Sequence, residues 1–471
     1  MPRVLLSAYA CEPGRGSEPG VGWSWATELS RLGHQVTVIT RAANRRAIEQ
    51  EASRLSQNIS FLYYDLPPWI QHWRSCPGGK ALYYVLWQWF VVQRVRQIFP
   101  SLPFDVVHHV TYVSARYPSF MAALGIPFWF GPVSGGEVVP PLLRAGFSAG
   151  QKRREWLRDI SNFLVALDPL MRRTFRQAER ILVTRDTLGL VPGRWRHKGT
   201  VHLAIGLSEQ DSTATNCQAK RSAHGFRVLY AGRLLEWKGV DIALHVIADV
   251  KQSYPGIRFT IVGDGPAKGK LTALSRELGL ETVVTWVGWL PQRAVVEHYA
   301  CADVLLFPSL RDSGGMVVLE SLAYGVPVLC TDLGGPGIMV NPTCGRSIAT
   351  AGRNPEQLTC DLSSALLEIV TVPNMLESLS YGAKVRAREF NFQDLVRSVY
   401  PAPSKTASQP ETEFCSGTNA ARFIRSSREA AAFVLAAGVS PRSSRNKDEP
   451  RSGDTSLGQS LPSARQMVPD P

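Results

Sequence analysis

The chain has 471 residues, which is too long for one compact core and suits two or three domains of roughly 100–200 residues each. Hydrophobic residues make up 44% and charged residues 19%, so fibrous and wholly disordered classes are excluded. The net charge of +13 lies mostly in residues 1–210, which carry 25 Lys and Arg against 14 Asp and Glu, whereas residues 211–400 carry 18 of each. A basic half joined to a neutral half predicts that two domains handle two different partners.

The location of the protein is predicted from its apolar runs and its cysteines. No apolar run approaches the roughly 20 residues that span a bilayer, and the run in MPRVLLSAYACEPG is too short for a signal peptide. The eight cysteines include no CxxC pair and no tight cluster, whereas metal sites and disulfide frameworks need closer or more regular spacing. We therefore expect a cytoplasmic protein with reduced thiols and no metal site.

Two stretches of the basic half combine aromatic and cationic residues. They comprise residues 69–96, with four tryptophans and two tyrosines among arginines, and residues 151–176, with Lys-Arg-Arg-Glu-Trp and Met-Arg-Arg-Thr-Phe-Arg. Such helices suit an anionic membrane surface, which would place the protein at the inner face of the membrane. The alternative is that the aromatic rings pack in the core while the arginines face solvent. Nucleic acid is not expected as a partner, because no nucleic-acid motif accompanies the charge.

In chain order, the first half predicts a strand at 4–9, a Gly/Pro-rich loop at 12–22, a helix at 23–32 that ends at Gly33, and a strand at 35–40. This strand–loop–helix–strand order builds parallel sheets. Further strands are predicted at residues 59–64, 106–110, 127–130 and 181–184.

The second half repeats this alternation after a polar linker at 208–225. Strands are predicted at residues 227–231, 258–262, 282–287, 304–307 and 327–330. Two successive doubly wound α/β domains, 1–207 and 226–385, are the simplest account, and ligands of such sheets bind at the carboxyl ends of the strands. Residues 386–400 are predicted to form a helix that crosses back to the first domain. Residues 401–471 are low in complexity and are predicted to be a disordered tail.

Three segments of the second domain carry candidate chemistry. A strand end at 229–232 leads into Gly232, Arg233 and Lys238, where glycine permits close approach to a phosphate and two cations can neutralise a diphosphate. A tight turn at Gly263 ends another strand. The third segment holds two acids eight residues apart around a Gly-rich helix start, which would present N–H groups to an anion.

In this order and spacing the segments resemble the retaining, sugar-nucleotide-dependent glycosyltransferases of family 4, which have the GT-B fold of two Rossmann-like domains facing a central cleft. The resemblance covers about residues 1–400 and is most specific at 229–335. The family's Gly-Arg…Lys turn matches Gly232, Arg233 and Lys238, and its paired acids, usually Glu-x7-Glu, match Asp312 and Glu320. Here Asp stands for the first Glu, and Ser-Gly-Gly for the usual Gly-Phe-Gly, which puts the identity of the donor sugar in question.

The resemblance implies roles for these residues. Glu320 would hold the ribose, Arg233 and Lys238 the diphosphate, and Asp312 the transferred sugar, with catalysis mainly electrostatic and without a metal. The other residues implied to contact the donor are Gly263, Gly314, Gly315, Met316 and Val317 in the second domain and Gly20 and Gly22 in the Gly-rich loop of the first.

The family often carries an active-site histidine at a strand end of the first domain, commonly as His-x-His. This chain has His108-His109 followed by Val110, and we expect His109 rather than His108 to contact the donor sugar. The alternative is a histidine whose hydrogen bonds are satisfied within the sheet. Residues 131–137, Gly-Pro-Val-Ser-Gly-Gly-Glu, form either a second wall of the cleft or a plain turn.

The resemblance implies a hexosyltransferase that takes a nucleoside-diphosphate sugar as substrate, needs no cofactor, and acts on a lipid-linked or polysaccharide acceptor in cell-surface glycan biosynthesis such as lipopolysaccharide. Two alternatives remain open: a GT-B isomerase or phosphorylase, and a catalytically inactive scaffold, for which Asp in place of Glu at 312 is the argument. A NAD(P) dehydrogenase is disfavoured, because no GxGxxG opens a helix after the first strand.

Overall fold

The computed structural model describes residues 2–15, 17–51, 55–76, 78–207 and 225–400. The linker and the tail predicted from composition therefore lie outside the described residues, except for Gly225. Within the described part of the chain, no helix combines the length and apolar character needed to cross a membrane.

The first sheet has seven parallel strands in the order β3-β2-β1-β4-β5-β6-β7. Its strands are β1 (Arg3–Ser7), β2 (Gln35–Thr40), β3 (Ile59–Tyr63), β4 (Val106–His109), β5 (Phe128–Val133), β6 (Arg180–Val183) and β7 (Gly199–Val201). Its helices are α1 (Ser17–Arg31), α2 (Arg45–Glu51), α3 (Pro68–Gln71), α4 (Gly79–Ile98), α5 (Ala149–Val165) and α6 (Pro169–Gln177).

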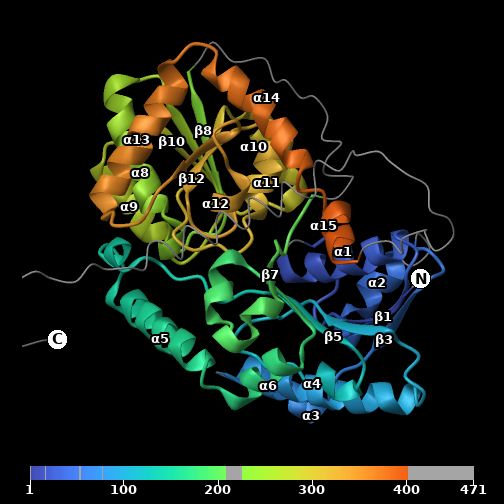
Figure 1. The fold of residues 1–471 in the computed structure, drawn as a ribbon. Helices are drawn as coiled ribbons and strands as arrows, with labels where there is room; N and C mark the ends of the chain where they lie inside the picture. The colour runs from blue at the N-terminus through green and yellow to red at the C-terminus, as the bar shows by residue number, and fades with distance from the viewer. Residues whose placement is uncertain (1, 16, 52–54, 77, 208–224, 401–471) are drawn as a thin grey trace, which may run out of the picture. The chain divides into compact units, whose positions relative to one another are not determined.

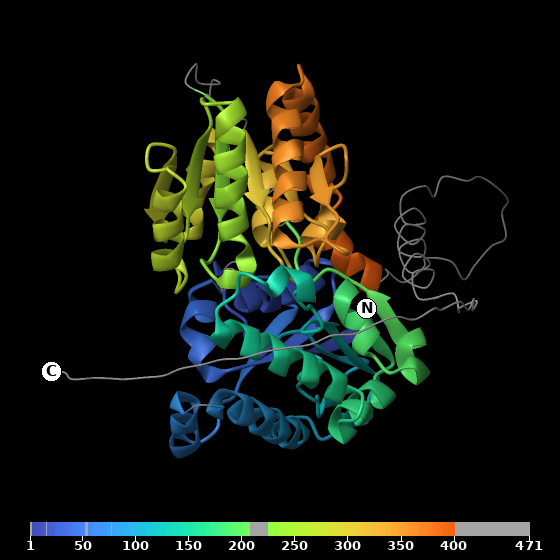
Figure 2. The ribbon, with the colours of Figure 1, turned by 90° about the vertical axis from the view of Figure 1, so that its left-hand side faces the viewer.

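Side chains alternate along the central strand of this sheet, which gives it two hydrophobic faces. Val4 and Leu6 of β1 pack with α1 on one face, whereas Leu5 packs with α4 and α6 on the other. Figure 2 shows α3 and α4, in light blue, along the outside of the first domain. The sheet is therefore covered on both sides, as expected for a buried parallel sheet.

The second sheet has six parallel strands in the order β10-β9-β8-β11-β12-β13. Its strands are β8 (Arg227–Ala231), β9 (Arg258–Val262), β10 (Val284–Gly288), β11 (Val304–Phe307), β12 (Val328–Thr331) and β13 (Gly345–Ile348). Its helices are α8 (Val240–Ser253), α9 (Lys268–Glu277), α10 (Gln292–Cys301), α11 (Met316–Ala323), α12 (Pro336–Met339), α13 (Pro355–Thr371) and α14 (Met375–Arg388). Figure 1 shows α8, α9 and α13 on one face and α10, α11 and α14 on the other.

The last described helix, α15 (Phe392–Val399), belongs to the core of the first sheet. Phe392, Leu395, Val396 and Val399 pack with α1 and β1, and the Tyr400 hydroxyl lies 2.9 Å from Nδ1 of His108. Helix α14 ends at Arg388, so the segment predicted as one helix is broken before α15 begins. The two doubly wound sheets confirm the predicted fold class.

Candidate functional site

The candidate site lies where the second sheet reverses its strand order. Strands β8 and β11 are neighbours, but the chain runs from β8 outward to β9 and from β11 outward to β12. The loops after two such strands diverge and leave room for a ligand at their carboxyl ends. Gly232, Arg233 and Lys238 follow β8, and Asp312 follows β11, so the predicted motif lies on both sides of this switch point.

Two glycines hold the turns after β8 and β9 against each other. Gly232 has a φ of 149° and donates its N–H to the carbonyl of Val262 at 2.9 Å. Gly263 has a φ of 146°, and a Cβ there would lie 1.9 Å from the carbonyl oxygen of Gly232. Only glycine fits this approach, so these glycines shape the turn that carries Arg233.

The two predicted diphosphate cations have different surroundings. Lys238 forms an ion pair with Asp312, the two side chains are each 17% exposed, and the ammonium lies 5.3 Å from the centre of the Phe307 ring. Arg233 is exposed, and its guanidinium has no ion-pair partner among the described residues. Arg233 is therefore available to an anion, whereas Lys238 is held by a carboxylate.

Asp312 also fixes the start of α11. Its carboxylate accepts the N–H groups of Gly315 at 3.0 Å and Gly314 at 3.3 Å, and Gly315 takes a φ of 78°. The N–H groups at this helix start, which were predicted to bind an anion, are thus hydrogen-bonded to Asp312. Met316 and Val317 begin the helix itself and are half-buried.

Glu320 lies one turn further along α11 and is positioned by α10. The Tyr299 hydroxyl donates to one oxygen at 2.8 Å, and the Gln292 amide donates to the other at 2.7 Å. Burial, with the adjacent Glu320 carboxylate, raises the pKa of Tyr299 well above its ordinary value, so this phenol remains a donor. Tyr299 and Gln292 could not be predicted from sequence, because nothing in the sequence of α10 indicates that two of its side chains support a carboxylate on α11.

Both predicted histidines are enclosed by other side chains. Nε2 of His109 lies 2.9 Å from the Tyr84 hydroxyl and its Nδ1 lies 2.8 Å from the Ser119 hydroxyl, while His108 contacts the Tyr400 hydroxyl and the Gly131 carbonyl. Successive side chains of β4 point to opposite faces of the sheet, so each ring enters one of its two cores. Burial lowers the pKa of both to about 3. Both histidines therefore match the alternative in which their hydrogen bonds are satisfied within the protein, and a contact between His109 and the donor sugar stays a prediction.

The first sheet has its own switch point, between β1 and β4, and a strained residue marks it. Tyr112 follows β4 with a φ of 58°, unusual for a residue with a side chain, and is 42% exposed. Its N–H donates to the carboxylate of Glu18 at 2.8 Å, and its ring lies 4.7 Å from that of Tyr9, which follows β1. Backbone strain of this kind concentrates at functional sites.

The Gly-rich segment of the first domain is helical where a loop was predicted. Gly20 and Gly22 lie in the first turns of α1, and a Cβ at either would stand 2.1 Å from a carbonyl oxygen, of Arg15 and Ala10 respectively. These glycines bring α1 against the loop after β1.

In the segment 131–137, Glu137 is buried and accepts from the Thr184 hydroxyl at 2.8 Å, so its role is to fix that turn.

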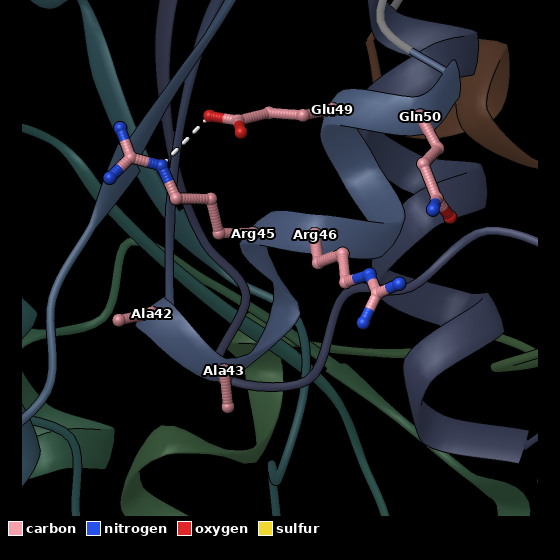
Figure 3. A pocket seen from close by; sticks show the side chains of 6 residues that line it. All are labelled: Ala42, Ala43, Arg45, Arg46, Glu49 and Gln50. Atoms are coloured by element: carbon pink, nitrogen blue, oxygen red, sulfur yellow. Dashed lines mark hydrogen bonds and ion pairs between the residues drawn. The ribbon is translucent and has the colours of Figure 1, made fainter.

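A surface hollow lies elsewhere, on α2 and the short turn before it. Figure 3 shows its lining, in which Arg45 donates to Glu49 at 2.8 Å. The lining residues are Ala42, Ala43, Arg45, Arg46, Glu49 and Gln50. None of the predicted site residues lines this hollow.

Across the described ranges, no group of three or more His, Cys, Asp or Glu side chains could hold a metal ion. The expectation that no cofactor is needed stays a prediction.

Two family models match the chain. Residues 16–189 match the glycosyl transferase 4-like domain, and residues 218–385 match the glycosyl transferases group 1 domain. The two matches lie over the two sheets and together cover well over half of the chain. The two matches thus define a protein of two Rossmann-like domains of the glycosyl transferase class.

Two proteins with similar sequences, from different bacteria, have the same name. A D-inositol 3-phosphate glycosyltransferase from Acidothermus cellulolyticus is 29% identical over 51% of this chain and 53% of its own length. The protein of the same name from Nocardia farcinica is 25% identical over 70% of this chain and 74% of its own. The chain spans about half the length, or less, of the first relatives it matches.

Solved structures agree in fold. Sucrose-phosphate synthase from Thermosynechococcus elongatus superposes with a TM-score of 0.56 at 18% identity, covering 85% of this chain and 98% of that one. HepE of Anabaena, solved with UDP and glucose, gives a TM-score of 0.51 at 16% identity, with the same coverage. The chain has the GT-B fold and belongs to the family 4-like, group 1 glycosyltransferases.

Proposed function

We propose that this protein transfers a sugar from a nucleoside-diphosphate sugar to a lipid-linked or polysaccharide acceptor, with retention of anomeric configuration, in cell-surface glycan synthesis at the inner face of the membrane. The observation that carries the proposal is the gathering of Arg233, the Lys238–Asp312 pair and Glu320 around the β8/β11 switch point. Arg233 has no ion-pair partner among the described residues, and Lys238 can be released by Asp312, so both cations suit a diphosphate. Glu320, which two hydrogen-bond donors hold in place, suits the hydroxyl groups of a ribose.

The chemistry follows from these positions. The acceptor hydroxyl oxygen bonds to the anomeric carbon while the bond from that carbon to the diphosphate oxygen breaks. The nucleoside diphosphate leaves with the electron pair and takes up the hydroxyl proton. Arg233 and Lys238 stabilise the charge that develops on the leaving group, and Glu320 fixes the nucleoside through its ribose hydroxyls. The low pKa of the buried histidines argues against either acting as general base.

Two observations favour a second candidate, a catalytically inactive scaffold. Lys238 and Asp312 neutralise each other, and Val110 stands where the family's His-x-His would place its second histidine. A protein that no longer turns over sugar could keep this pair for stability alone.

The test is a thermal-shift titration of the purified chain with UDP, GDP, ADP, UDP-glucose, UDP-galactose, UDP-GlcNAc and GDP-mannose. UDP is the first probe, because HepE was solved with it. A saturating rise in melting temperature with one nucleotide, lost in Glu320→Ala and kept in Glu297→Ala on the exposed face of α10, supports the donor site. A folded chain that no nucleotide stabilises would instead support the scaffold.

A further inference from the structure

Helix α5 has its polar and apolar faces reversed. Its buried residues are Gln151, Glu155 and Val165, whereas Trp156 is 59% exposed and Phe163 75% exposed. An ordinary surface helix of a globular protein turns its apolar stripe toward the core. The large apolar side chains that are exposed here are Trp156, Leu157, Ile160, Phe163 and Leu164, followed by Leu167 and by Leu170 at the start of α6.

The inward face of α5 is held by hydrogen bonds and ion pairs. Glu155 is 1% exposed and bonds Arg311 at 2.7 Å through both carboxylate oxygens. Asp159 pairs with Arg144, and Arg158 donates to the carbonyl of Glu137 at 2.8 Å. Because polar contacts already fix the orientation of the helix, rotation cannot bury the apolar stripe.

The exposed apolar residues of α5 form one continuous face. Spacings of three, four and seven residues from Trp156 to Phe163 place them on one side of the helix. Lys152, Arg153 and Arg154 precede this stripe and are exposed. Beyond it, on α6, Arg172, Arg173 and Arg176 are exposed as well. Of the acids on these two helices, Glu155 is buried against Arg311, the partly exposed Asp159 pairs with Arg144, and Asp168 caps α6; the exposed Glu179 follows α6.

We propose that the outer face of α5 and the start of α6, called the α5 face from here on, docks on an anionic lipid bilayer. Aromatic and aliphatic side chains enter the headgroup boundary while cations at both ends of the stripe meet lipid phosphates, as in interfacial amphipathic helices. A second copy of the chain is a poorer occupant, because a twofold contact would place these cations against each other. The proposal rests on the proposed function only in that a membrane-associated acceptor would explain why the face exists.

The experiment is co-sedimentation of the full chain with vesicles of phosphatidylcholine alone and with 30% phosphatidylglycerol. We expect binding to the anionic vesicles only, weakened by salt. The double variant Trp156→Ser/Phe163→Ser should bind at least ten-fold more weakly. The double variant Arg153→Ser/Arg154→Ser should lose about five-fold in affinity for each of the two cations removed. The matched controls are Tyr381→Ser, an aromatic residue 74% exposed on α14, and Arg293→Ser on α10, and both should bind like the unaltered chain.

Equal binding by the α5 variants and their controls, or no binding to any vesicle, overturns the proposal. A dimer in light scattering that the Trp156→Ser/Phe163→Ser variant converts to monomer overturns it in favour of a second copy. The same variants are titrated with the selected nucleotide. An unchanged nucleotide response shows that the site around Arg233 and Glu320 is intact, so failure of the docking surface is separable from failure of the proposed function.

Discussion

Replacing Asp312 by Asn tests whether the ion pair with Lys238 competes with a diphosphate. The two side chains are each 17% exposed, and Asp312 also accepts the N–H groups of Gly314 and Gly315. Asn keeps the shape and one acceptor oxygen but removes the charge. Because hydrogen bonds between charged, partly buried groups contribute about 1.5–3 kcal/mol and the pair is not fully desolvated, we expect a loss of about 1–2 kcal/mol in the free energy of unfolding.

The effect on nucleotide binding should have the opposite sign. Lys238 without its carboxylate is free to bind phosphate oxygens, so Asp312→Asn should bind the nucleoside diphosphate up to about ten-fold more tightly, a difference of about 1.4 kcal/mol. Lys238→Ala should bind it at least ten-fold more weakly. Transfer by Asp312→Asn should nevertheless fall, since Asp312 is proposed to hold the sugar.

The assay is isothermal titration calorimetry with the nucleotide selected by thermal shift, at low and high salt. The control is Asp394→Asn, which breaks an exposed pair with Arg397, 65% and 51% exposed, and should alter neither stability nor binding measurably. If Asp312→Asn weakens nucleotide binding as much as Lys238→Ala does, the carboxylate supports the site rather than competing for the lysine, and our reasoning is wrong.

Three further predictions concern stability and reactivity. Gly263→Ala should cost about 2–3 kcal/mol or more in thermal unfolding, because its Cβ would meet the Gly232 carbonyl at 1.9 Å, whereas Gly269→Ala in α9, with open space around it, should be neutral or slightly stabilising. Burial lowers the pKa of His108 and His109 to about 3. The unfolded chain therefore takes up their protons below about pH 6.5 while the folded chain does not, and the melting temperature should fall from pH 7.5 to 5.5; a flat profile would contradict their burial. Burial also raises the thiol pKa of Cys11 and Cys330, so iodoacetamide followed by mass spectrometry should label the exposed Cys76, Cys301 and Cys360 first, and early labelling of Cys11 would show that β1 opens.

Most strands of the two sheets could be predicted from sequence, and the elements that were not predicted have identifiable physical causes. Runs of Val, Ile and Leu bounded by Gly or Pro locate the central strands to within a few residues. The edge strands β7 and β13, with the sequences GTV and GRSI, were missed, because short edge strands need little apolar character. The start of α1 is helical although its Gly and Pro residues predict a loop. Proline is tolerated in a first helical turn, and the glycines there serve close packing rather than flexibility.

The candidate site could be predicted only in part. Spacing located Arg233, Lys238, Asp312 and Glu320, because residues after neighbouring parallel strands meet at one sheet edge. Spacing could not show that Lys238 and Asp312 bond each other, nor that Tyr299 and Gln292 hold Glu320, since those contacts depend on how α10 and α11 pack. Strand alternation indicates that His108 and His109 face opposite ways, but only the packing of Tyr84 and Tyr400 shows that both are enclosed.

The return of α15 to the first sheet has a consequence for the order in which the protein forms during synthesis. Phe392, Val396 and Tyr400 complete the core around Trp25 and His108, yet they leave the ribosome some 190 residues after the end of the first sheet. At roughly 5–20 residues per second, that interval is about 10–40 s. Throughout it the α1 side of the nascent first domain presents an uncovered apolar surface. The second domain, whose strands are contiguous in the chain, can close first, so chaperone contacts on the ribosome should concentrate on α1.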